Sequence, residues 1–256
     1  MGRTVAMVNQ KGGVGKTTVT LGLASAAWAA GHRVLVVDLD PQGASTWVLG
    51  HDPAEVERSS AEVLGKGALG DAVVASAWGD SVDLIPASLR LQAREHSSGK
   101  DAAQRLRAAL ERLEGGYEAV LIDCPPSLGN LTVNGLTAAD HAVIVVEPAA
   151  LGLRGIGAVA DVVDEIWEQH NPGLDLAGVI VNKVPAISAE AERRFEELGR
   201  IVGKRAVWKP AVPQRVIVNQ ALGERRPLHS YGARASEVTD AFDHLWAKLR
   251  RVMKGS

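Results

Sequence analysis

Short apolar runs alternate with longer segments of helical periodicity along the whole chain. Val, Ile and Leu nearly fill most of the short runs, without strict polar alternation. This composition is typical of strands that are buried on both faces of a parallel sheet. The predicted strands are Thr4–Val8, Arg33–Asp38, Val82–Pro86, Ala119–Asp123, Ala142–Glu147 and Leu176–Val181.

Helix-length segments lie between these strands, at Lys16–Ala30, Ser88–Leu113, Thr132–Ala139, Gly155–Gln169 and Ser188–Val202. Strand–helix alternation predicts an α/β fold with right-handed crossovers, in which a doubly wound, mostly parallel sheet carries helices on both faces. Ligands of such folds bind at the carboxyl ends of the strands. Residues 50–80 are the least regular stretch, and we expect short helices and loops there. No repeat or linker interrupts the pattern, so residues 1–256 are interpreted as a single domain.

A glycine-rich loop follows the first predicted strand and opens the first predicted helix. Residues 9–18 read Asn-Gln-Lys-Gly-Gly-Val-Gly-Lys-Thr-Thr. Glycines let backbone N–H groups approach phosphate oxygens, and the helix N-terminus adds partial positive charge. Lys16 can reach the β- and γ-phosphates as a catalytic cation, and the Thr17 hydroxyl can coordinate Mg²⁺. The predicted nucleotide-binding residues of the loop are Lys11, Gly12, Gly13, Val14, Gly15, Lys16, Thr17 and Thr18.

This loop departs from the pattern G-x-x-x-x-G-K-[ST], because Gln10 stands at the first glycine position and Lys11 follows it. In this form it resembles the deviant Walker A motif of the ParA/MinD ATPases, a branch of the P-loop NTPases. The match to the ParA (Soj) branch continues, in the family's order, in four further motifs. They are Val-Asp-Leu-Asp-Pro-Gln-Gly at 37–43, Leu-Ile-Asp-Cys-Pro-Pro-Ser at 121–127, Val-Asn-Lys at 181–183 and Val-Pro-Gln-Arg-Val at 212–216.

The resemblance implies a slow, partner-stimulated ATPase that uses ATP and Mg²⁺, and it assigns roles by position. Lys11 looks like the signature lysine, a catalytic residue that crosses to the ATP of a second subunit in an ATP-dependent homodimer. A second cation on the transferred phosphoryl group stabilises the charge that spreads over its oxygens. Asp40 belongs to switch I and helps to position the attacking water. Asp123 resembles the Walker B aspartate, and Asp38 supports either the water shell of the metal or the switch.

We expect Mg²⁺ to use Thr17, Asp38 and Asp123, because this ion keeps several waters and takes few direct carboxylates. A structural role of either carboxylate as a helix N-cap is the alternative. By the same resemblance, Asn182 reads the edge of the adenine, and Pro213 lies in the base-contacting loop. Family members often carry Gln-x-Glu after the fifth strand, whereas this chain has Glu147-Pro148-Ala149, so no contact is carried over to the second acidic position.

The charge is unevenly distributed, although the formal net charge is only −2. Residues 1–187 carry 14 basic and 22 acidic side chains, a net of −8, and residues 188–256 carry 14 and 8, a net of +6. A basic C-terminal quarter predicts an anionic partner, nucleic acid or lipid, with solvated helix faces as the alternative. ParA-like proteins use such residues to bind double-stranded DNA without reading sequence. The candidates are Arg193, Arg194, Arg215, Arg225 and Arg226. Arg215 comes first by the resemblance, because the family places DNA-contacting arginines in the Pro-Gln-Arg segment, and an ordinary surface arginine is the alternative.

A MinD-like, membrane-associated positioning ATPase is the alternative function. The last predicted helix, Ser236–Met253, has an apolar stripe opposite a basic face. Such a helix can dock on a membrane, as in the MinD branch. It can also pack its stripe onto the sheet, as in the ParA branch, and we expect this second arrangement. The position of Trp246 distinguishes the two, because this side chain is either buried in the core or free to enter lipid. A ParB-like or other adaptor protein is expected to stimulate hydrolysis.

Cysteine content and apolar runs narrow the functional class. Cys124 is the single cysteine, which fits a reducing cytosol, and no secretory leader or apolar run of about 18 residues is present. We therefore expect a cytoplasmic protein, and the resemblance to the ParA branch implies that it is nucleoid-associated. A nitrogenase-reductase-like protein needs two cysteines per subunit for its shared iron–sulfur cluster, so this class is excluded. A synthetase-type ligase stays open, without a recognisable substrate pocket.

Overall fold

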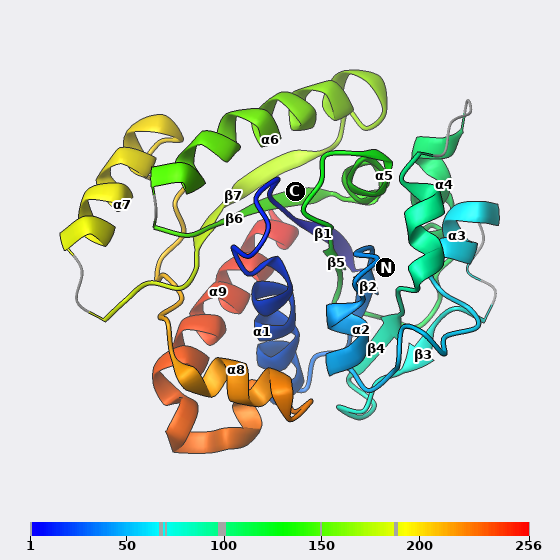
Figure 1. Cartoon of the computed structure of the whole chain (residues 1–256), viewed down its shortest axis with the longest axis horizontal. Coiled ribbons are helices and arrows are strands. Elements are labelled where there is room, and N and C mark those ends of the chain that lie inside the picture. Colours follow the sequence, from blue (N-terminus) through cyan, green and yellow to red (C-terminus); the bar gives the residue numbers. More distant parts are fainter. Residues whose placement is uncertain are drawn as a thin grey trace.

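A twisted, mostly parallel sheet forms the centre of the molecule (Figure 1). The computed structural model describes residues 2–66, 69, 71–96, 101–148, 150–186 and 189–255. Within this part of the chain the sheet has seven strands, in the order β3-β4-β2-β5-β1-β6-β7. All neighbouring pairs are parallel except β3 with β4. The strands are β1 (Arg3–Val8), β2 (Val34–Asp38), β3 (Val74–Ala75), β4 (Val82–Ile85), β5 (Ala119–Asp123), β6 (His141–Val146) and β7 (Asp175–Val181).

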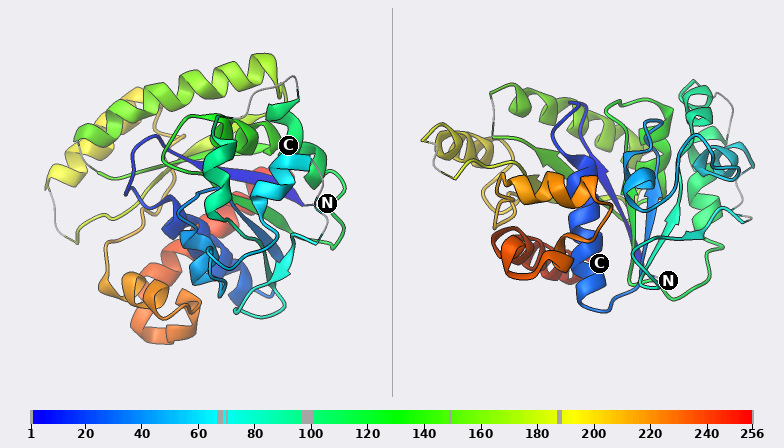
Figure 2. Two further views of the ribbon diagram at one scale, coloured as in Figure 1. Left: turned by 45° about the vertical axis from the view of Figure 1, so that its right-hand side comes forward. Right: turned by 60° about the horizontal axis from the view of Figure 1, so that its bottom comes forward.

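Helices cover both faces of this sheet (Figures 1 and 2). The α-helices are α1 (Lys16–Ala29), α2 (Ala44–Val48), α3 (Ser60–Lys66), α4 (Arg105–Leu110), α5 (Asn130–Ala138), α6 (Ala150–Gln169), α7 (Ala189–Ile201), α8 (Val216–Gly223) and α9 (Ser236–Lys254). The 3₁₀ helices are η1 (Leu89–Arg94), η2 (Ala102–Gln104) and η3 (Leu228–Ala235). Alternate strand residues point into two cores: Val5 and Met7 face α1 and α9, whereas Ala6 and Val8 face the layer of α3 to α6. The predicted doubly wound α/β fold is confirmed.

The predicted helix Ser88–Leu113 is wrong, and four other elements, α2, β3, α8 and η3, were missed. The segment contains η1, η2 and then α4, which begins only at Arg105. Ser97, Ser98 and Gly99 have low helix propensity and interrupt the pattern; residues 97–100, like residue 188 of the predicted helix Ser188–Val202, lie outside the described residues. The antiparallel edge strand β3 and helix α8 were not predicted. The first residues of α8 are Val-Ile-Val, a β-branched run that reads as a strand.

Helix α9 packs its apolar stripe into the core, as expected, but mainly against α1 and not against the sheet. Phe242 is fully buried against Gly22, and a Cβ at position 22 would lie 2.2 Å from Phe242 Cζ. The glycine therefore allows the two helices to approach closely. Trp246 is 3% exposed, and its Nε1 donates a hydrogen bond to His32 Nδ1 at 3.1 Å. No helix within the described residues is long and apolar enough to cross a membrane.

A partly buried histidine links α1, η3 and α9. His229 Nδ1 lies 2.7 Å from Ser25 Oγ, and its Nε2 lies 3.1 Å from Asp243 Oδ1. Burial lowers the pKa of His229 below its ordinary value of 6.5, although the neighbouring Asp243 opposes this shift. The folded protein therefore favours the neutral imidazole, and protonation opposes folding.

The titration of His229 predicts a loss of stability in acid. The free energy of unfolding of the natural protein, relative to a His229→Gln variant, should be constant above pH 6.5. It should fall as the pH drops below this value towards the lower pKa of the folded state, because the unfolded chain then binds more protons. Urea denaturation of both proteins between about pH 5 and 8 measures the difference. A relative stability that rises on acidification contradicts the prediction.

Candidate functional site

The glycine-rich loop connects β1 to α1 at the carboxyl edge of the sheet, where the sequence predicted it (Figure 1). Gly13 and Gly15 have left-handed backbones, with φ of 80° and 91°. Gly15 is also packed closely, because a Cβ there would lie 2.1 Å from Asn182 Nδ2. Side chains at these two positions would strain the backbone or clash, so the glycines are required by the shape of the loop. Such a loop before a helix N-terminus is suited to bind phosphate.

Lys16 lies inside the cradle that the loop forms. Its side chain is buried, and Nζ donates a hydrogen bond to the carbonyl oxygen of Asn9 at 3.1 Å. Burial lowers the pKa of Lys16, whereas the negative charge of Asp123 raises it. A phosphate group beside this partly desolvated ammonium would supply further counter-charge. The geometry therefore fits a nucleotide whose phosphates lie over the loop.

A buried carboxylate lies next to the N-terminus of α1. Asp123 Oδ2, at the end of β5, accepts hydrogen bonds from Thr17 Oγ1 and Ser45 Oγ, both at 2.7 Å. Its Oδ1 is buried and has no hydrogen-bond partner among the described residues. Burial raises the pKa of Asp123 to about 6, and the nearby Asp40 contributes to the increase. An oxygen without a partner, beside a threonine hydroxyl and the phosphate cradle, fits a Mg²⁺ site with few protein ligands.

Asp38 organises the loop that follows β2. Its Oδ2 accepts hydrogen bonds from Thr46 N at 2.8 Å and Thr46 Oγ1 at 2.7 Å, and its Oδ1 accepts one from Asp40 N at 3.0 Å. Burial, with a contribution from Asp123, raises the pKa of Asp38 to about 8. These contacts agree with a supporting role in the switch, and a role in metal binding stays a prediction. Asp40 lies at the partly exposed rim, where its Oδ1 accepts a hydrogen bond from Gln42 N at 2.9 Å.

Lys11 lies outside the cradle that holds Lys16. Its side chain is 36% exposed, and Nζ is 3.4 Å from Glu147 Oε2, just beyond the end of β6. Its backbone N–H donates to Asn9 Oδ1 at 2.9 Å, which fixes the start of the loop. The two lysines of the motif therefore have different surroundings, one buried among the loop carbonyls and one at the surface on a carboxylate.

The predicted adenine residues lie at the β7 side of the loop. Asn182 Nδ2 donates a hydrogen bond to the carbonyl oxygen of Val14 at 2.9 Å, so this side chain also supports the phosphate loop. Pro213 forms an isolated bridge with Val184, and both line a cavity of about 430 Å³ together with Arg215. The structure thus brings both predicted residues to the same edge as the loop.

Comparison with known proteins identifies the family. A family model described as an AAA domain matches residues 2–176. The sporulation initiation inhibitor protein Soj of Bacillus subtilis is 34% identical over 237 residues, which cover 92% of this chain and 93% of Soj. The chromosome partitioning protein ParA of Caulobacter vibrioides is 35% identical over 234 residues, covering 90% of this chain and 87% of that protein. The chain belongs to the ParA/Soj-type partition ATPases of the ParA/MinD family.

A solved structure of a related protein contains nucleotide and metal. Cobyrinic acid a,c-diamide synthase from Mycobacterium smegmatis, with bound ADP and magnesium, matches with a TM-score of 0.83 and 30% identity. The match covers 100% of this chain and 97% of the synthase. Together with the phosphate cradle and the partnerless Asp123 oxygen, this makes the ParA-type chain an ATPase that uses ATP and Mg²⁺.

The predicted DNA-binding arginines of this ParA-type chain do not form one patch. Arg193 and Arg194 lie on α7 and pair with Glu190, and Figure 1 shows α7 well apart from α8. Arg215, at the start of α8, forms a two-pronged ion pair with Glu237.

The other two arginines follow α8 and contact aromatic rings. The guanidinium carbon of Arg225 lies 4.1 Å from the centroid of the Trp47 ring, and that of Arg226 lies 5.0 Å from the centroid of the Tyr231 ring. Among the described residues neither guanidinium forms an ion pair with a carboxylate, although the hydrogen bond from Tyr231 and, to a smaller extent, the charge of Arg226 lower the pKa of the nearby Glu224. All five DNA-binding assignments stay predictions.

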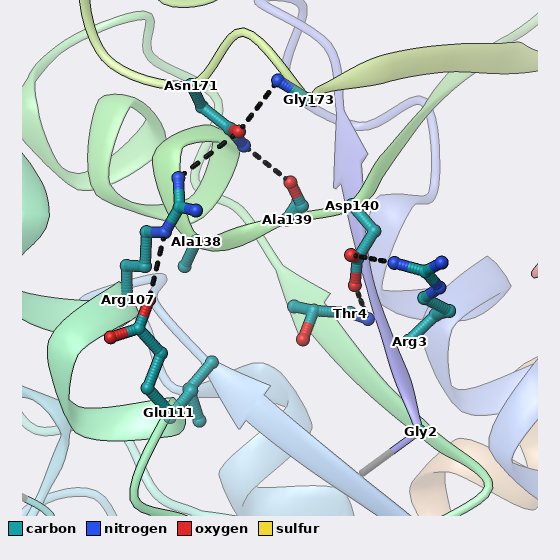
Figure 3. A pocket seen from close by; sticks show the side chains of 11 residues that line it. Gly2, Arg3, Thr4, Arg107, Glu111, Ala138, Ala139, Asp140, Asn171 and Gly173 are labelled. Atoms are coloured by element: carbon teal, nitrogen blue, oxygen red, sulfur yellow. Dashed lines mark hydrogen bonds and ion pairs between the residues drawn. The ribbon is translucent and has the colours of Figure 1, made fainter. Parts of the chain in front are cut away.

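A polar pocket of about 370 Å³ lies at the opposite edge of this ParA-type molecule, near the start of β1 (Figure 3). Its polar groups are already paired. Arg3 Nη1 contacts Asp140 Oδ1 at 2.8 Å, and Arg107 donates to Asn171 and Glu111. The glycine-rich loop, and not this pocket, therefore stays the predicted nucleotide site.

Sequence reasoning missed Ser45, Glu147 and Lys183. Ser45 holds Asp123, and Glu147 and Lys183 form an ion pair beside the loop. The departure at Glu147 from the Gln-x-Glu pattern and the place of Lys183 in the motif at 181–183 were the available signals, whereas nothing local to Ser45 indicated its distant partner.

Proposed function

We propose that the chain is a DNA partition ATPase whose ATP-bridged dimer binds double-stranded DNA without reading its sequence. The protein acts in the cytoplasm and associates with the nucleoid. A ParB-like or other adaptor protein stimulates hydrolysis, and hydrolysis releases the subunits from the DNA. The observation that carries this proposal is the separation of the two loop lysines. Lys16 occupies the phosphate cradle, whereas Lys11 lies at the surface outside it. A cation placed there is suited to serve the phosphates of a second subunit.

The described residues have separate roles in the proposed hydrolysis reaction. Backbone N–H groups of residues 12–18 and the Lys16 ammonium hold and orient the phosphates. Thr17 and Asp123 would hold Mg²⁺, which neutralises phosphate charge when bound. Asp40, at the rim of the loop that Asp38 organises, positions the attacking water. Lys11 of the second subunit stabilises the charge on the transferred group, so hydrolysis depends on dimerisation.

The contacts of Asp123, the proposed metal ligand, indicate how nucleotide binding changes the surface that is proposed to contact DNA. Ser45, on α2, is hydrogen-bonded to Asp123. Trp47, on the same short helix, contacts the Arg225 guanidinium. Occupation of the nucleotide site would change the contacts of Asp123 and, through α2, the surroundings of this arginine. Arg225 and Arg226 are for this reason our first candidates for phosphate contacts, ahead of Arg215, which Glu237 neutralises.

DNA binding by an Asp40→Ala variant, which we expect to bind but not hydrolyse ATP, tests the proposal. A random-sequence duplex should bind with ATP and Mg²⁺, but not with ADP or without nucleotide. Affinity should fall steeply with salt, and changing both Arg225 and Arg226 to Ala should reduce the log–log slope by about 1.8, because each neutralised phosphate contributes about 0.9. Fluorescence anisotropy at several salt concentrations measures both effects.

The control is Arg58→Ala, which removes one exposed arginine that pairs with Asp71 and lies outside the basic C-terminal quarter of the sequence. This change should leave the slope as it is. ATP-dependent dimers that bind no DNA would contradict the proposal. Binding of the same dimers to anionic lipid vesicles would then support the MinD-like alternative.

A further inference from the structure

Glu147 binds two lysines at the rim of the nucleotide site. Its Oε2 is 3.4 Å from Lys11 Nζ, and its Oε1 is 3.2 Å from Lys183 Nζ. The carboxylate follows β6 directly, and its side chain is 23% exposed. Each of its oxygens therefore has one cationic partner, and one of these partners is the lysine to which the proposed function gives a role in the second subunit.

The chain after β7 holds this arrangement in place. Lys183 has a φ of 57°, a left-handed backbone that a lysine adopts only when its surroundings impose it. From there its Nζ contacts Glu147 and also donates a hydrogen bond to the carbonyl oxygen of Gly13. The adjacent Asn182 donates to the carbonyl oxygen of Val14. The position of Glu147 is thus fixed from the β7 side, independently of Lys11.

We propose that Glu147 is a positioning residue that retains Lys11 in its own subunit until an ATP-bound partner arrives. The inference rests on the proposed role of Lys11 across the dimer. When the Lys11 ammonium moves to the phosphates of the partner, it leaves Glu147, so two ion pairs break for each dimer that forms. Lys183 stays with Glu147 and compensates its charge, which keeps the cost of release small.

The charge at position 147 has a physical meaning under this proposal. This chain carries a glutamate there, and glutamine is the uncharged residue of nearly the same shape. A neutral amide attracts an ammonium group more weakly than a carboxylate does. The charged residue therefore raises the concentration of ATP-bound monomer at which dimers form, and it suppresses hydrolysis in isolated subunits.

A purely structural role of Glu147 predicts a different outcome. If the carboxylate only supports the phosphate loop, its loss loosens the loop and weakens the binding of ADP to the monomer. If it retains Lys11, its loss leaves ADP binding unchanged and favours the dimer. The affinity of the monomer for ADP and the dissociation constant of the dimer therefore separate the two roles.

The test compares Asp40→Ala with Asp40→Ala/Glu147→Gln by sedimentation in ATP and Mg²⁺. The glutamine should lower the dissociation constant of the dimer roughly fivefold, the effect of losing two partly exposed ion pairs. ADP affinity, measured by calorimetry, should stay within about twofold. With Asp40 intact, the protein concentration that gives half-maximal specific ATPase activity should fall by the same factor. Glu165→Gln, an equal change of charge on an exposed residue of α6, should alter none of these values.

Three results would overturn the inference. An unchanged or weaker dimer in the glutamine variant means that Glu147 does not retain Lys11, while the proposed DNA-binding dimer still stands. Weaker ADP binding with an unchanged dimer assigns Glu147 to the support of the loop. If the Asp40→Ala protein forms no ATP-dependent dimer at all, the proposed function fails first, and the inference fails with it.

Discussion

Replacing Lys11 by alanine is expected to lower the rate of ATP hydrolysis by about 10²–10³-fold, which is the usual effect of removing one group that stabilises transition-state charge. The binding of ADP to the monomer should change little, because Lys11 lies outside the cradle and contacts Glu147. Steady-state ATPase assays and calorimetry with ADP measure these two quantities. The protein concentration should lie above that at which the natural protein dimerises.

Lys16→Ala is the matched comparison, because it removes the same charge five residues further along the same motif but inside the cradle. It should weaken nucleotide binding as well as hydrolysis, since its ammonium is buried beside Asp123 and the carbonyl oxygen of Asn9. Equal losses of ADP affinity in both variants would show that Lys11 serves its own nucleotide. The proposed action across the dimer would then be wrong.

The parts of the site that were predictable from the sequence are those in which local chain geometry carries the chemistry. The loop from Lys11 to Thr18 needs glycines at left-handed positions, a lysine and a hydroxyl in fixed order, and the strand before it and helix after it are equally local. Asp123 was recognisable because it ends a fully buried strand in a motif of its own. In such segments each residue has few alternative roles, so the pattern alone limits the structure.

Pairings between distant segments were not predictable in the same way. Lys11 and Glu147 are 136 positions apart, and Ser45 reaches Asp123 across 78 positions. Arg215 illustrates the consequence, because its motif suggested a DNA contact, whereas the folded chain provides Glu237 as its partner. The charge of a residue is visible in the sequence, but whether that charge is neutralised depends on tertiary contacts.

The prediction of secondary structure failed where the intrinsic preference of the residues disagrees with their tertiary surroundings. Helix α8 begins with Val216, Ile217 and Val218, whose branched side chains favour strands, yet Ile217 and Val218 pack against the core beside α1 and α9. Tertiary burial thus overrides a modest intrinsic preference in α8. The opposite error occurred in Ser88–Leu113, where a periodic apolar pattern suggested one long helix despite the residues of low helix propensity within it.

Truncation of Phe242 to alanine should cause a large loss of stability, about 3–5 kcal/mol, because it removes a buried aromatic ring and leaves a cavity. The ring is fully buried, and it packs directly over Gly22 of α1, so the neighbouring glycine has no side chain with which to fill the space. Urea denaturation followed by circular dichroism measures the change. Val216→Ala, at a residue that is 83% exposed, should alter the stability by less than about 0.5 kcal/mol.

The same denaturation experiment tests whether the apolar stripe of α9 is held in the core or is available to dock on a membrane. The buried stripe of this helix includes Val238, Phe242, Leu245, Trp246 and Leu249, and all of them contribute to the core shared with α1. A helix that must leave this core to enter a lipid surface would lose most of that buried apolar area, so docking on a membrane would compete with folding. If Phe242→Ala cost less than about 1 kcal/mol, α9 would be only loosely attached, and its stripe would be available for lipid. A loss in the expected range ties α9 to the core and favours DNA as the anionic partner of the basic C-terminal quarter.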